Sequence, residues 1–263
     1  MKRIVLFDMD GTLTPARKSI EKPVIEKLSA LQEFADIGIV SGSPYDYIVS
    51  QISDLWTHND SLDPRRIKIM PCNGTKLFQY RTETSSFYKT YDTDMIHYIG
   101  KDKYRVLISI LTDLQNSLVE TQKDLPLSGN FISFRGSMIN WCMIGRDADH
   151  LMREQFQSMD DGLRLALKFK LDEELQLGNI DSMKTSLGGT TSIDIYPKGW
   201  DKTYCLSHID ENWSVYFVGD KCTPEGNDYE LFIDERTKSY MTTGPKQTCM
   251  IIDDITKEIT DAY

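Results

Sequence analysis

The chain has 263 residues and a formal net charge of −10, and its 40% hydrophobic and 27% charged residues are typical of globular proteins. This acidic balance argues against a general nucleic-acid or anionic-membrane surface, because phosphate-rich surfaces are bound by excess positive charge. No apolar run approaches the roughly 18 residues of a membrane span, and the N-terminal run is too short for a signal peptide. We therefore expect a soluble protein with one large domain or with a core domain and an inserted one.

The cysteines indicate a reducing compartment. They are scattered, odd in number and never form a CxxC pair: Cys72, Cys142, Cys205, Cys222 and Cys249. Disulfide frameworks and zinc sites show paired cysteines at regular spacing, so this pattern predicts free thiols, no zinc site and a cytoplasmic protein.

The first predicted strand is the apolar run from Ile4 to Phe7, which is typical of a strand buried on both faces. A helix with Ser19 as its N-cap is expected to run to about Phe34, because apolar residues recur there at helical spacing. Pro23 lies in the first turn of that helix, where proline is tolerated.

Two more strands follow, over residues 37–40 and 67–70, with a helix that carries Tyr47, Ile48 and Ile52 between them. Strand and helix in alternation predict a Rossmann-like parallel sheet. In such sheets ligands bind beyond the carboxyl ends of the strands. The first two strands end in DMDGT and SGS, so both segments are expected at the binding edge.

The pattern changes over residues 83–196. A helix near 103–118 precedes two alternating stretches, FISFRG and SMINWCMIG, which predict an antiparallel hairpin. Helices from about Asp149 and over 163–175 follow, and then the alternating strand TSIDIY. We therefore predict an α/β fold with a core domain of residues 1–82 and 197–263 and an inserted α+β cap domain of residues 83–196.

The core pattern resumes after Pro197. An apolar strand over 215–218 ends in Gly219-Asp220, a further strand is expected over 239–242, and a terminal helix closes the chain. Carboxylates at two neighbouring strand ends would form an oxygen-rich site for a hard cation, with Mg²⁺ as the default. A carboxylate in such a site can attack phosphorus when a cation neutralises the incoming phosphate.

Four motifs in this order resemble those of the haloacid dehalogenase superfamily of phosphoryl-transfer enzymes. They are DMDGT, a serine at the second strand end, a lysine, and GD with a later ND. Within that superfamily the chain is similar to eukaryotic-type phosphomannomutases, most specifically in PKGWDK at 197–202 and GDKCTPEGNDYELF at 219–232. With gaps, the resemblance runs over most of the chain.

The resemblance implies roles for the core residues. Asp8 would be the phosphorylated nucleophile and Asp10 the general acid/base, while Ser43 and Lys202 would hold the phosphoryl group. Mg²⁺ would be held by Asp8, the backbone carbonyl of Asp10, and Asp220, with Asp228 supporting the metal shell. The segment with Phe232, Asp234 and Thr237 resembles a second, structural cation site.

The resemblance also implies a substrate-binding set. Arg17, Arg135, Arg146 and Arg153 would bind substrate phosphate, Ser192 and Asp194 would contact sugar hydroxyls, and Asn140, Gly188 and Gly189 lie in the matching motifs. The arginines supply a local positive cluster in an acidic chain, and guanidinium groups bind phosphate bidentately.

As a family member, the protein would interconvert mannose 6-phosphate and mannose 1-phosphate in GDP-mannose biosynthesis. It would use glucose 1,6-bisphosphate or mannose 1,6-bisphosphate as activator and would dimerise through the cap.

The chain departs from the family at several positions. The second motif reads Ser41-Gly42-Ser43-Pro44 where the family has Gly-Gly-Ser-Asp, so either serine could contact the phosphoryl group. Two alternatives to a mutase also remain open. One is an Mg²⁺-dependent sugar-phosphate phosphatase that transfers the phosphoryl group to water, and the other is a noncatalytic sugar-phosphate-binding protein.

Overall fold

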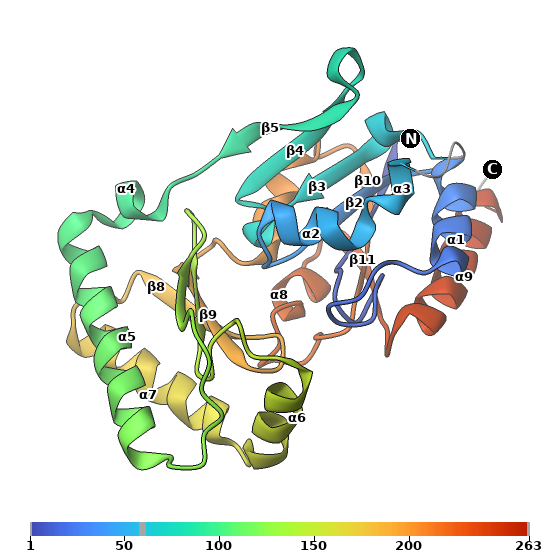
Figure 1. Ribbon diagram of the computed structural model, residues 1–263. Coiled ribbons are helices and arrows are strands. Elements are labelled where there is room, and N and C mark those ends of the chain that lie inside the picture. Colours follow the sequence, from blue (N-terminus) through green and yellow to red (C-terminus); the bar gives the residue numbers. More distant parts are fainter. Residues whose placement is uncertain (1, 58–61, 262–263) are drawn as a thin grey trace. The chain divides into compact units, whose positions relative to one another are not determined.

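The computed structural model describes residues 2–57 and 62–261, and within them the chain forms two compact units (Figure 1). Unit 1 contains residues 1–92 and 200–263, and unit 2 contains residues 93–199. The chain crosses between the units at Asp92/Thr93 and at Gly199/Trp200, whereas the predicted cap domain covers residues 83–196.

Unit 1 is built on a seven-stranded sheet of order β11-β10-β1-β2-β3-β4-β5. Its strands are β1 (Arg3–Phe7), β2 (Asp36–Val40), β3 (Ile67–Met70), β4 (Lys76–Arg81), β5 (Ser86–Asp92), β10 (Ser214–Gly219) and β11 (Thr237–Met241). The first five strands in the order are parallel, and β4 and β5 continue the sheet antiparallel. The α/β fold with a mostly parallel sheet is confirmed, but β5, which was assigned to the cap, belongs to this sheet.

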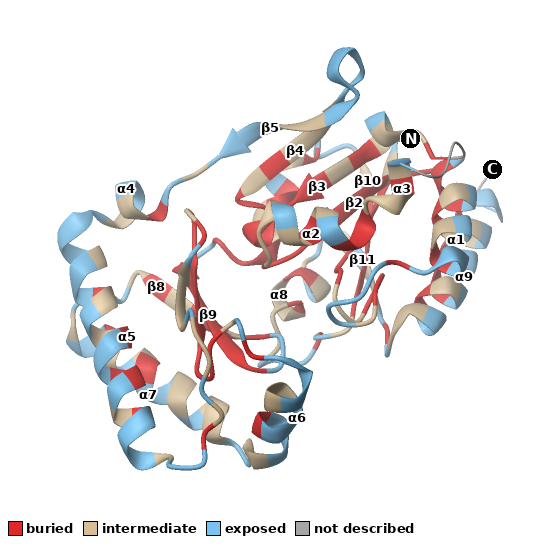
Figure 2. Cartoon of the chain, in the orientation of Figure 1, coloured by how far each residue is buried: buried red, intermediate tan, exposed pale blue. Residues whose placement is uncertain are grey.

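The helices of unit 1 lie on both sides of this sheet. They are α1 (Lys22–Gln32), α2 (Tyr45–Ile52), α3 (Asp54–Thr57), α8 (Tyr229–Phe232), α9 (Pro245–Asp261) and the 3₁₀ helices Pro64–Arg66, Cys72–Gly74, Thr82–Thr84 and Lys202–His208. Helices α1 and α9 pack side by side, and their outward sides are exposed while the central strands are buried (Figure 2).

Strand alternation divides the core of unit 1 in two. On β1, Val5 and Phe7 pack in a cluster with apolar residues of α1, α2 and α9. Ile4 and Leu6 pack in a second cluster with Leu206 of the 3₁₀ helix and with α8. Because successive side chains of a strand point to opposite faces, this continuous apolar run is buried on both sides, as predicted.

Unit 2 contains a four-stranded antiparallel sheet of order β6-β7-β9-β8. Its elements are α4 (Met95–Ile99), α5 (Lys101–Thr121), β6 (Ile132–Phe134), β7 (Ile139–Cys142), α6 (His150–Met159), α7 (Leu163–Leu177), β8 (Met183–Gly188) and β9 (Ser192–Pro197). The predicted hairpin is β6–β7, and Asp149 caps α6 by accepting from the Met152 N–H at 2.9 Å.

Alternation also separates the two faces of the unit 2 sheet. Ile193 and Ile195 of β9 are buried on one face, and Ser192 and Asp194 lie on the other. Helix α5 is tied to β7 by a hydrogen bond of 2.7 Å from Trp141 Nε1 to Gln115 Oε1, and Gln115 Nε2 donates to the Met143 carbonyl. The sheet therefore carries a polar row of side chains opposite an apolar one.

Candidate active site

Asp8 and Asp10 lie directly beyond the carboxyl end of β1. The Asp8 N–H donates to the Val218 carbonyl at 3.0 Å, which continues the pairing of β1 with β10 and fixes the backbone at this point. The Asp8 side chain is buried, whereas Asp10 is partly exposed.

Three carboxylates gather at this edge of the sheet. One oxygen each of Asp8, Asp220 and Asp228 lies within 4.8 Å of the others. Asp8 follows β1 and Asp220 follows β10, so the parallel pairing of these strands brings the two side chains together. Among residues 2–57 and 62–261, this is the one group of three acidic, cysteine or histidine side chains close enough to share a cation.

Lys202 provides the positive charge in this cluster. Its side chain has no solvent exposure, and its Nζ donates to Asp8 Oδ1 and Asp228 Oδ1. The second oxygen of Asp228 accepts from the Lys221 N–H at 2.9 Å, so Asp228 is held at both oxygens. Asp228 therefore holds the Lys202 ammonium through one oxygen and the backbone of its own loop, at Lys221, through the other.

The electrostatics of the cluster follow from burial. Burial raises the pKa of the Asp8 carboxyl well above its ordinary value, against the opposing effect of the Lys202 ammonium. Burial and then the charge of Asp228 raise the pKa of Asp220. Burial lowers the pKa of Lys202, but Asp228 and Asp8 together outweigh that effect and raise it above its ordinary value. The three carboxylates, of which Asp8 and Asp228 are buried and Asp220 is half-buried, outnumber the two nearby ammonium groups, Lys202 and the exposed Lys221, whose Nζ lies 3.6 Å from Asp220 Oδ2, so an excess of negative charge remains.

The cluster fits a divalent cation. Asp220 Oδ1 is buried and has no hydrogen-bond partner among the described residues, which is costly for a carboxylate oxygen. Carboxylate oxygens are the ligands that Mg²⁺ prefers. A divalent cation would neutralise the excess negative charge and satisfy this oxygen.

Gly11 makes room for one of these carboxylates. A Cβ on Gly11 would meet Asp220 Oδ2 at 2.5 Å, and the backbone has a φ of +90° at this residue. The glycine after the second aspartate of DMDGT is therefore required both by backbone conformation and by the approach of Asp220.

The Asp10 side chain is held by two donors. Its Oδ1 accepts from the Arg17 N–H at 2.9 Å and from the Tyr47 hydroxyl at 3.3 Å. Burial, followed by the charge of Asp10, raises the pKa of Tyr47 to about 12, so the phenol is protonated near neutral pH and can donate. The sequence interpretation placed Tyr47 only on a helix, and its contact with Asp10 was missed.

Both serines of the second motif lie at the end of β2. Ser41 is buried, and its Oγ accepts from the Ser43 N–H at 3.1 Å. Its carbonyl accepts from the Asn73 N–H at 2.9 Å, and Asn73 Nδ2 donates to the Trp200 carbonyl at 3.1 Å. This network fixes the loop, but the choice between Ser41 and Ser43 stays a prediction.

In unit 2, four predicted residues form one hydrogen-bonded group on the polar face of the sheet. Asn140 pairs with Asp194 in the β7–β9 register, and its Nδ2 donates to Asp194 Oδ1 at 2.6 Å and to Ser192 Oγ at 2.9 Å. Arg146 donates to Asn140 Oδ1 at 3.0 Å. The structure therefore brings together four residues of the predicted cap set, and their roles in substrate binding stay predictions.

The other two predicted arginines of unit 2 are also anchored. Arg153 donates to Thr191 Oγ1 at 2.7 Å and to the Arg146 carbonyl at 2.8 Å. Arg135 is buried, with its NH1 3.9 Å from Asp194 Oδ1. Arg146, Arg153 and Arg135 thus converge around the Asn140 group through direct contacts or through a shared partner.

Gly188 contacts the Asn140 group, and Gly189 is the next residue in the chain. The Ser192 hydroxyl donates to the Gly188 carbonyl at 2.7 Å, and a Cβ on Gly188 would meet Asp194 Oδ2 at 2.7 Å. The Gly189 carbonyl accepts from Arg164 at 3.1 Å, a residue that the motifs did not indicate. Gly188 therefore leaves room for the Asp194 carboxylate.

The segment predicted as a second cation site is held by hydrogen bonds among its own residues. The Asp234 carboxylate accepts from the Arg236 N–H at 2.9 Å, and the Thr237 hydroxyl donates toward the Leu231 carbonyl at 2.8 Å and the Asp234 carbonyl at 3.0 Å. Phe232 lies at the end of α8 in the same turn. Asp234 is the one carboxylate among the three predicted residues, and the second site stays a prediction.

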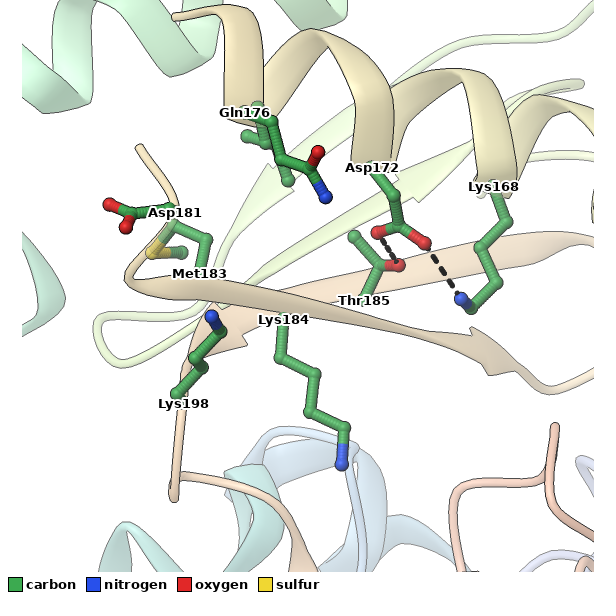
Figure 3. Close-up of a pocket in the computed structure, with 9 residues that line it drawn as sticks. Lys168, Asp172, Gln176, Asp181, Met183, Lys184, Thr185 and Lys198 are labelled. Atoms are coloured by element: carbon green, nitrogen blue, oxygen red, sulfur yellow. Dashed lines mark hydrogen bonds and ion pairs between the residues drawn. The ribbon is translucent and has the colours of Figure 1, made fainter. Parts of the chain in front are cut away.

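A separate pocket of about 380 Å³ lies between α7 and β8 (Figure 3). In it, Asp172 accepts from Lys168 at 2.9 Å and from Thr185, while the Lys184 side chain points away from this group. The predicted site residues are absent from the described lining, so this pocket is not the substrate site that the motifs indicate.

The sequence of the chain also matches a known protein family. The family model described as eukaryotic phosphomannomutase matches residues 24–258. The chain belongs to this family. It is 34% identical to the phosphomannomutase of Saccharomyces cerevisiae, over 96% of this chain and 93% of that protein. It is 33% identical to the Schizosaccharomyces pombe phosphomannomutase, over 94% and 91%, and 31% identical to human phosphomannomutase 1, over 93% and 88%.

Solved structures support the fold of this family member. The chain is similar to a Plasmodium falciparum IMP-nucleotidase with IMP bound, at a TM-score of 0.68 and 15% identity, over 97% of this chain and 68% of that chain. It is also similar to Aspergillus fumigatus trehalose-6-phosphate phosphatase, at a TM-score of 0.52 and 14% identity, over 97% and 93%. At such low identity the structural similarity shows the fold alone, and this fold agrees with the predicted haloacid dehalogenase-type α/β core.

The described part of the chain contains no helix with the length and apolar character needed to cross a membrane.

Proposed function

We propose that this protein is a phosphomannomutase that interconverts mannose 6-phosphate and mannose 1-phosphate through a phospho-aspartate on Asp8. Membership of the family supports the reaction, and one observation carries the mechanism. The Asp8 carboxylate lies at the carboxyl end of β1, bonded to the buried Lys202 and within the carboxylate cluster of Asp220 and Asp228.

In the first half-reaction, an Asp8 oxygen attacks the phosphorus of a hexose 1,6-bisphosphate, and the bond from phosphorus to the sugar oxygen breaks. Asp10 gives a proton to the departing sugar oxygen. In the second half-reaction, Asp10 takes a proton from a sugar hydroxyl, whose oxygen attacks phospho-Asp8 and releases the carboxylate. Asp10 lies two residues after the nucleophile, beyond the end of the same strand.

Mg²⁺ held by Asp8, Asp220 and the Asp10 carbonyl would neutralise the oxygens of the transferring phosphoryl group. Lys202 would stabilise the same oxygens with its ammonium group, and Asp228 holds that group in place. Ser41 or Ser43 would add a hydrogen bond.

The unit 2 residues would bind the end of the hexose that does not react. Because the two ends differ chemically, the enzyme must accept the non-reacting phosphate in two orientations. The arginines around the Asn140 group suit this need, since each guanidinium offers several donors in a plane. Arg17 would add a phosphate contact from unit 1.

A mutase of this kind would supply mannose 1-phosphate for GDP-mannose synthesis in the cytoplasm, and the family suggests a homodimer formed through the cap. The free cysteines and the acidic charge are compatible with that compartment.

The phospho-aspartate can be tested directly. The purified enzyme is mixed with glucose 1,6-bisphosphate carrying labelled phosphate, quenched in acid and digested. We expect label on the peptide with Asp8 and its release by hydroxylamine, as for an acyl phosphate. The Asp8→Asn variant should carry none. Equal labelling of this variant would contradict the assignment of Asp8.

A further inference from the structure

We propose that Tyr47 is a positioning residue for the reaction, which holds Asp10 so that Oδ2 is the oxygen that exchanges the proton with the sugar. The proposal rests on the proposed function, since it takes Asp10 as the general acid/base. It concerns the hydroxyl of one side chain on α2, whose contact with Asp10 is visible in the structure alone.

The two oxygens of Asp10 are in different surroundings. Within residues 2–57 and 62–261, both hydrogen bonds of the Asp10 side chain reach Oδ1, one from the Arg17 N–H at 2.9 Å and one from the Tyr47 hydroxyl at 3.3 Å. Two donors from different parts of the chain restrict rotation about the bond between Cβ and the carboxyl carbon. They leave Oδ2 as the oxygen that is open to a reacting group.

The position of the Arg17 N–H is fixed by the backbone, because the chain makes a sharp turn there. Arg17 has a φ of +62°, in the left-handed region that non-glycine residues seldom adopt. The turn aims the N–H at Asp10, so the first donor depends on backbone conformation and not on the identity of the side chain. A substitution can therefore remove the second donor, Tyr47, while leaving the first in place.

Helix α2 is tied to the loop that carries Asp10. Gln51 lies one turn after Tyr47, is buried, and accepts from Thr14 Oγ1 at 3.0 Å. Its carbonyl accepts from the Ile20 N–H at 2.8 Å. Residues on both sides of Arg17 are thus bonded to the helix that carries Tyr47, which keeps the hydroxyl at a fixed place relative to Asp10.

A fixed carboxylate matters because proton transfer requires the donor and acceptor atoms to be aligned in the transition state. When Tyr47 loses its hydroxyl, Oδ1 keeps one donor and the carboxylate rotates more freely. Less of the enzyme then presents Oδ2 to the sugar oxygen, so the chemical step slows while substrate binding is unchanged.

Tyr47→Phe tests this, with Tyr45→Phe as the matched control. Tyr45 lies two residues earlier on α2, and its ring stacks on Phe78 at 3.9 Å between centroids. Both variants lose one phenol hydroxyl from the same helix. We expect kcat for mannose 1-phosphate to fall about tenfold in Tyr47→Phe with KM unchanged, the size of a lost hydrogen bond to a charged group, and to stay near wild type in Tyr45→Phe.

A second substrate separates positioning from general damage. The p-nitrophenolate of p-nitrophenyl phosphate is a good leaving group that departs without a proton. With enzyme in excess, we expect Tyr47→Phe to release p-nitrophenol at the wild-type rate while its phosphoryl transfer from the hexose bisphosphate is slow. Equal slowing with both compounds would overturn the proposal, because a distorted site would affect both.

The Asp10→Asn variant separates the acid/base role of Asp10 from the positioning role of Tyr47. Retained turnover of hexose phosphates in Asp10→Asn would overturn the acid/base role of Asp10 and the role of Tyr47 with it. An inactive Asp10→Asn with a normal kcat in Tyr47→Phe would overturn the Tyr47 proposal alone. An equal loss of kcat in Tyr45→Phe would also overturn it.

Discussion

The ammonium group of Lys202 bonds to the carboxylate of Asp228, and neither side chain has any solvent exposure. The lysine also contacts Asp8, so one buried cation holds two carboxylates from distant parts of the chain. A buried ion pair owes much of its importance to what happens when one partner is removed, since the remaining charge then lacks compensation.

Lys202→Met should therefore destabilise the fold strongly, by about 3 to 5 kcal/mol, the usual cost of leaving a buried charge without its partner. The free energy of unfolding in urea, measured with EDTA present, gives this value. The double variant with Asp228→Asn should recover part of the loss, because one of the stranded charges is gone. A loss of stability in the double variant equal to the sum of the two single-variant losses would contradict the coupling.

Magnesium should raise the stability of the wild-type protein. A ligand that binds only the folded state stabilises it by about 2.7 kcal/mol at 100 times its Kd. The measurement is the free energy of unfolding with Mg²⁺ and with EDTA. The gain should disappear in Asp220→Asn, which loses a carboxylate whose Oδ1 has no partner among the described residues. Equal stability of wild type in both conditions would count against a metal at this cluster.

Gly11→Ala should disturb the same cluster from the other side. The added Cβ would meet Asp220 Oδ2 at 2.5 Å, so the carboxylate must move, and we expect overpacking to cost about 1 to 3 kcal/mol and to weaken magnesium binding. Gly162→Ala is the control, since Gly162 has a φ of +78° with open space around its Cβ. The control shares the backbone strain. An equal dependence of activity on Mg²⁺ in both variants would show that the contact with Asp220 has no effect.

Arg146→Ala should chiefly weaken substrate binding. A lost hydrogen bond to a charged group costs about 1.5 to 3 kcal/mol, which corresponds to a rise in KM for the hexose phosphates of about tenfold or more. The exposed Arg105, on α5, provides the control variant Arg105→Ala. An unchanged KM for both hexose phosphates in Arg146→Ala would remove this residue from the substrate site.

His208 should make stability depend on pH. Burial lowers the pKa of this histidine below 6.5, and its Nε2 lies 2.7 Å from the Gly74 carbonyl. The unfolded chain then takes up a proton at a higher pH than the folded one, so the stability present above pH 6.5 is lost as the pH falls toward the folded-state pKa. His208→Gln should flatten the free energy of unfolding between about pH 7.5 and 5. An unchanged slope would exclude this histidine as its source.

The strands that the sequence predicted well are those buried on both faces. Residues 67–70 form β3 as predicted, and the run from Ile4 to Phe7 forms β1 with one added residue. The strands β4, β5 and β8 were missed because they mix polar and apolar residues, and β5 is largely exposed at the edge of the sheet. Hydrophobic periodicity is a weak signal in strands of such mixed composition, even where, as in β8, most residues are buried.

The start of α1 shows how tertiary contacts override a local signal. Ser19 was predicted as the N-cap, but the helix begins at Lys22 with Glu21 at the cap position. The Ile20 N–H donates to the Gln51 carbonyl, which holds this part of the chain as a loop. Pro23 still occupies the first turn, as predicted.

The site residues also divide into those that the sequence motifs indicated and one that they missed. The motifs indicated Asp8, Lys202, Asp220 and Asp228, and the structure brings these four side chains together. Tyr47 was missed because a tyrosine beside isoleucines at helical spacing predicts a core position. Its contact with Asp10 depends on how α2 packs beside the loop after β1, which spacing alone does not encode.

The most direct test of the central claim is a coupled assay of mannose 1-phosphate conversion, with and without glucose 1,6-bisphosphate, in which free phosphate is measured in parallel. We predict that mannose 6-phosphate forms in a reaction that depends on the bisphosphate and exceeds the release of inorganic phosphate. Dominant phosphate release that is unaffected by the bisphosphate would contradict the account and identify a phosphatase.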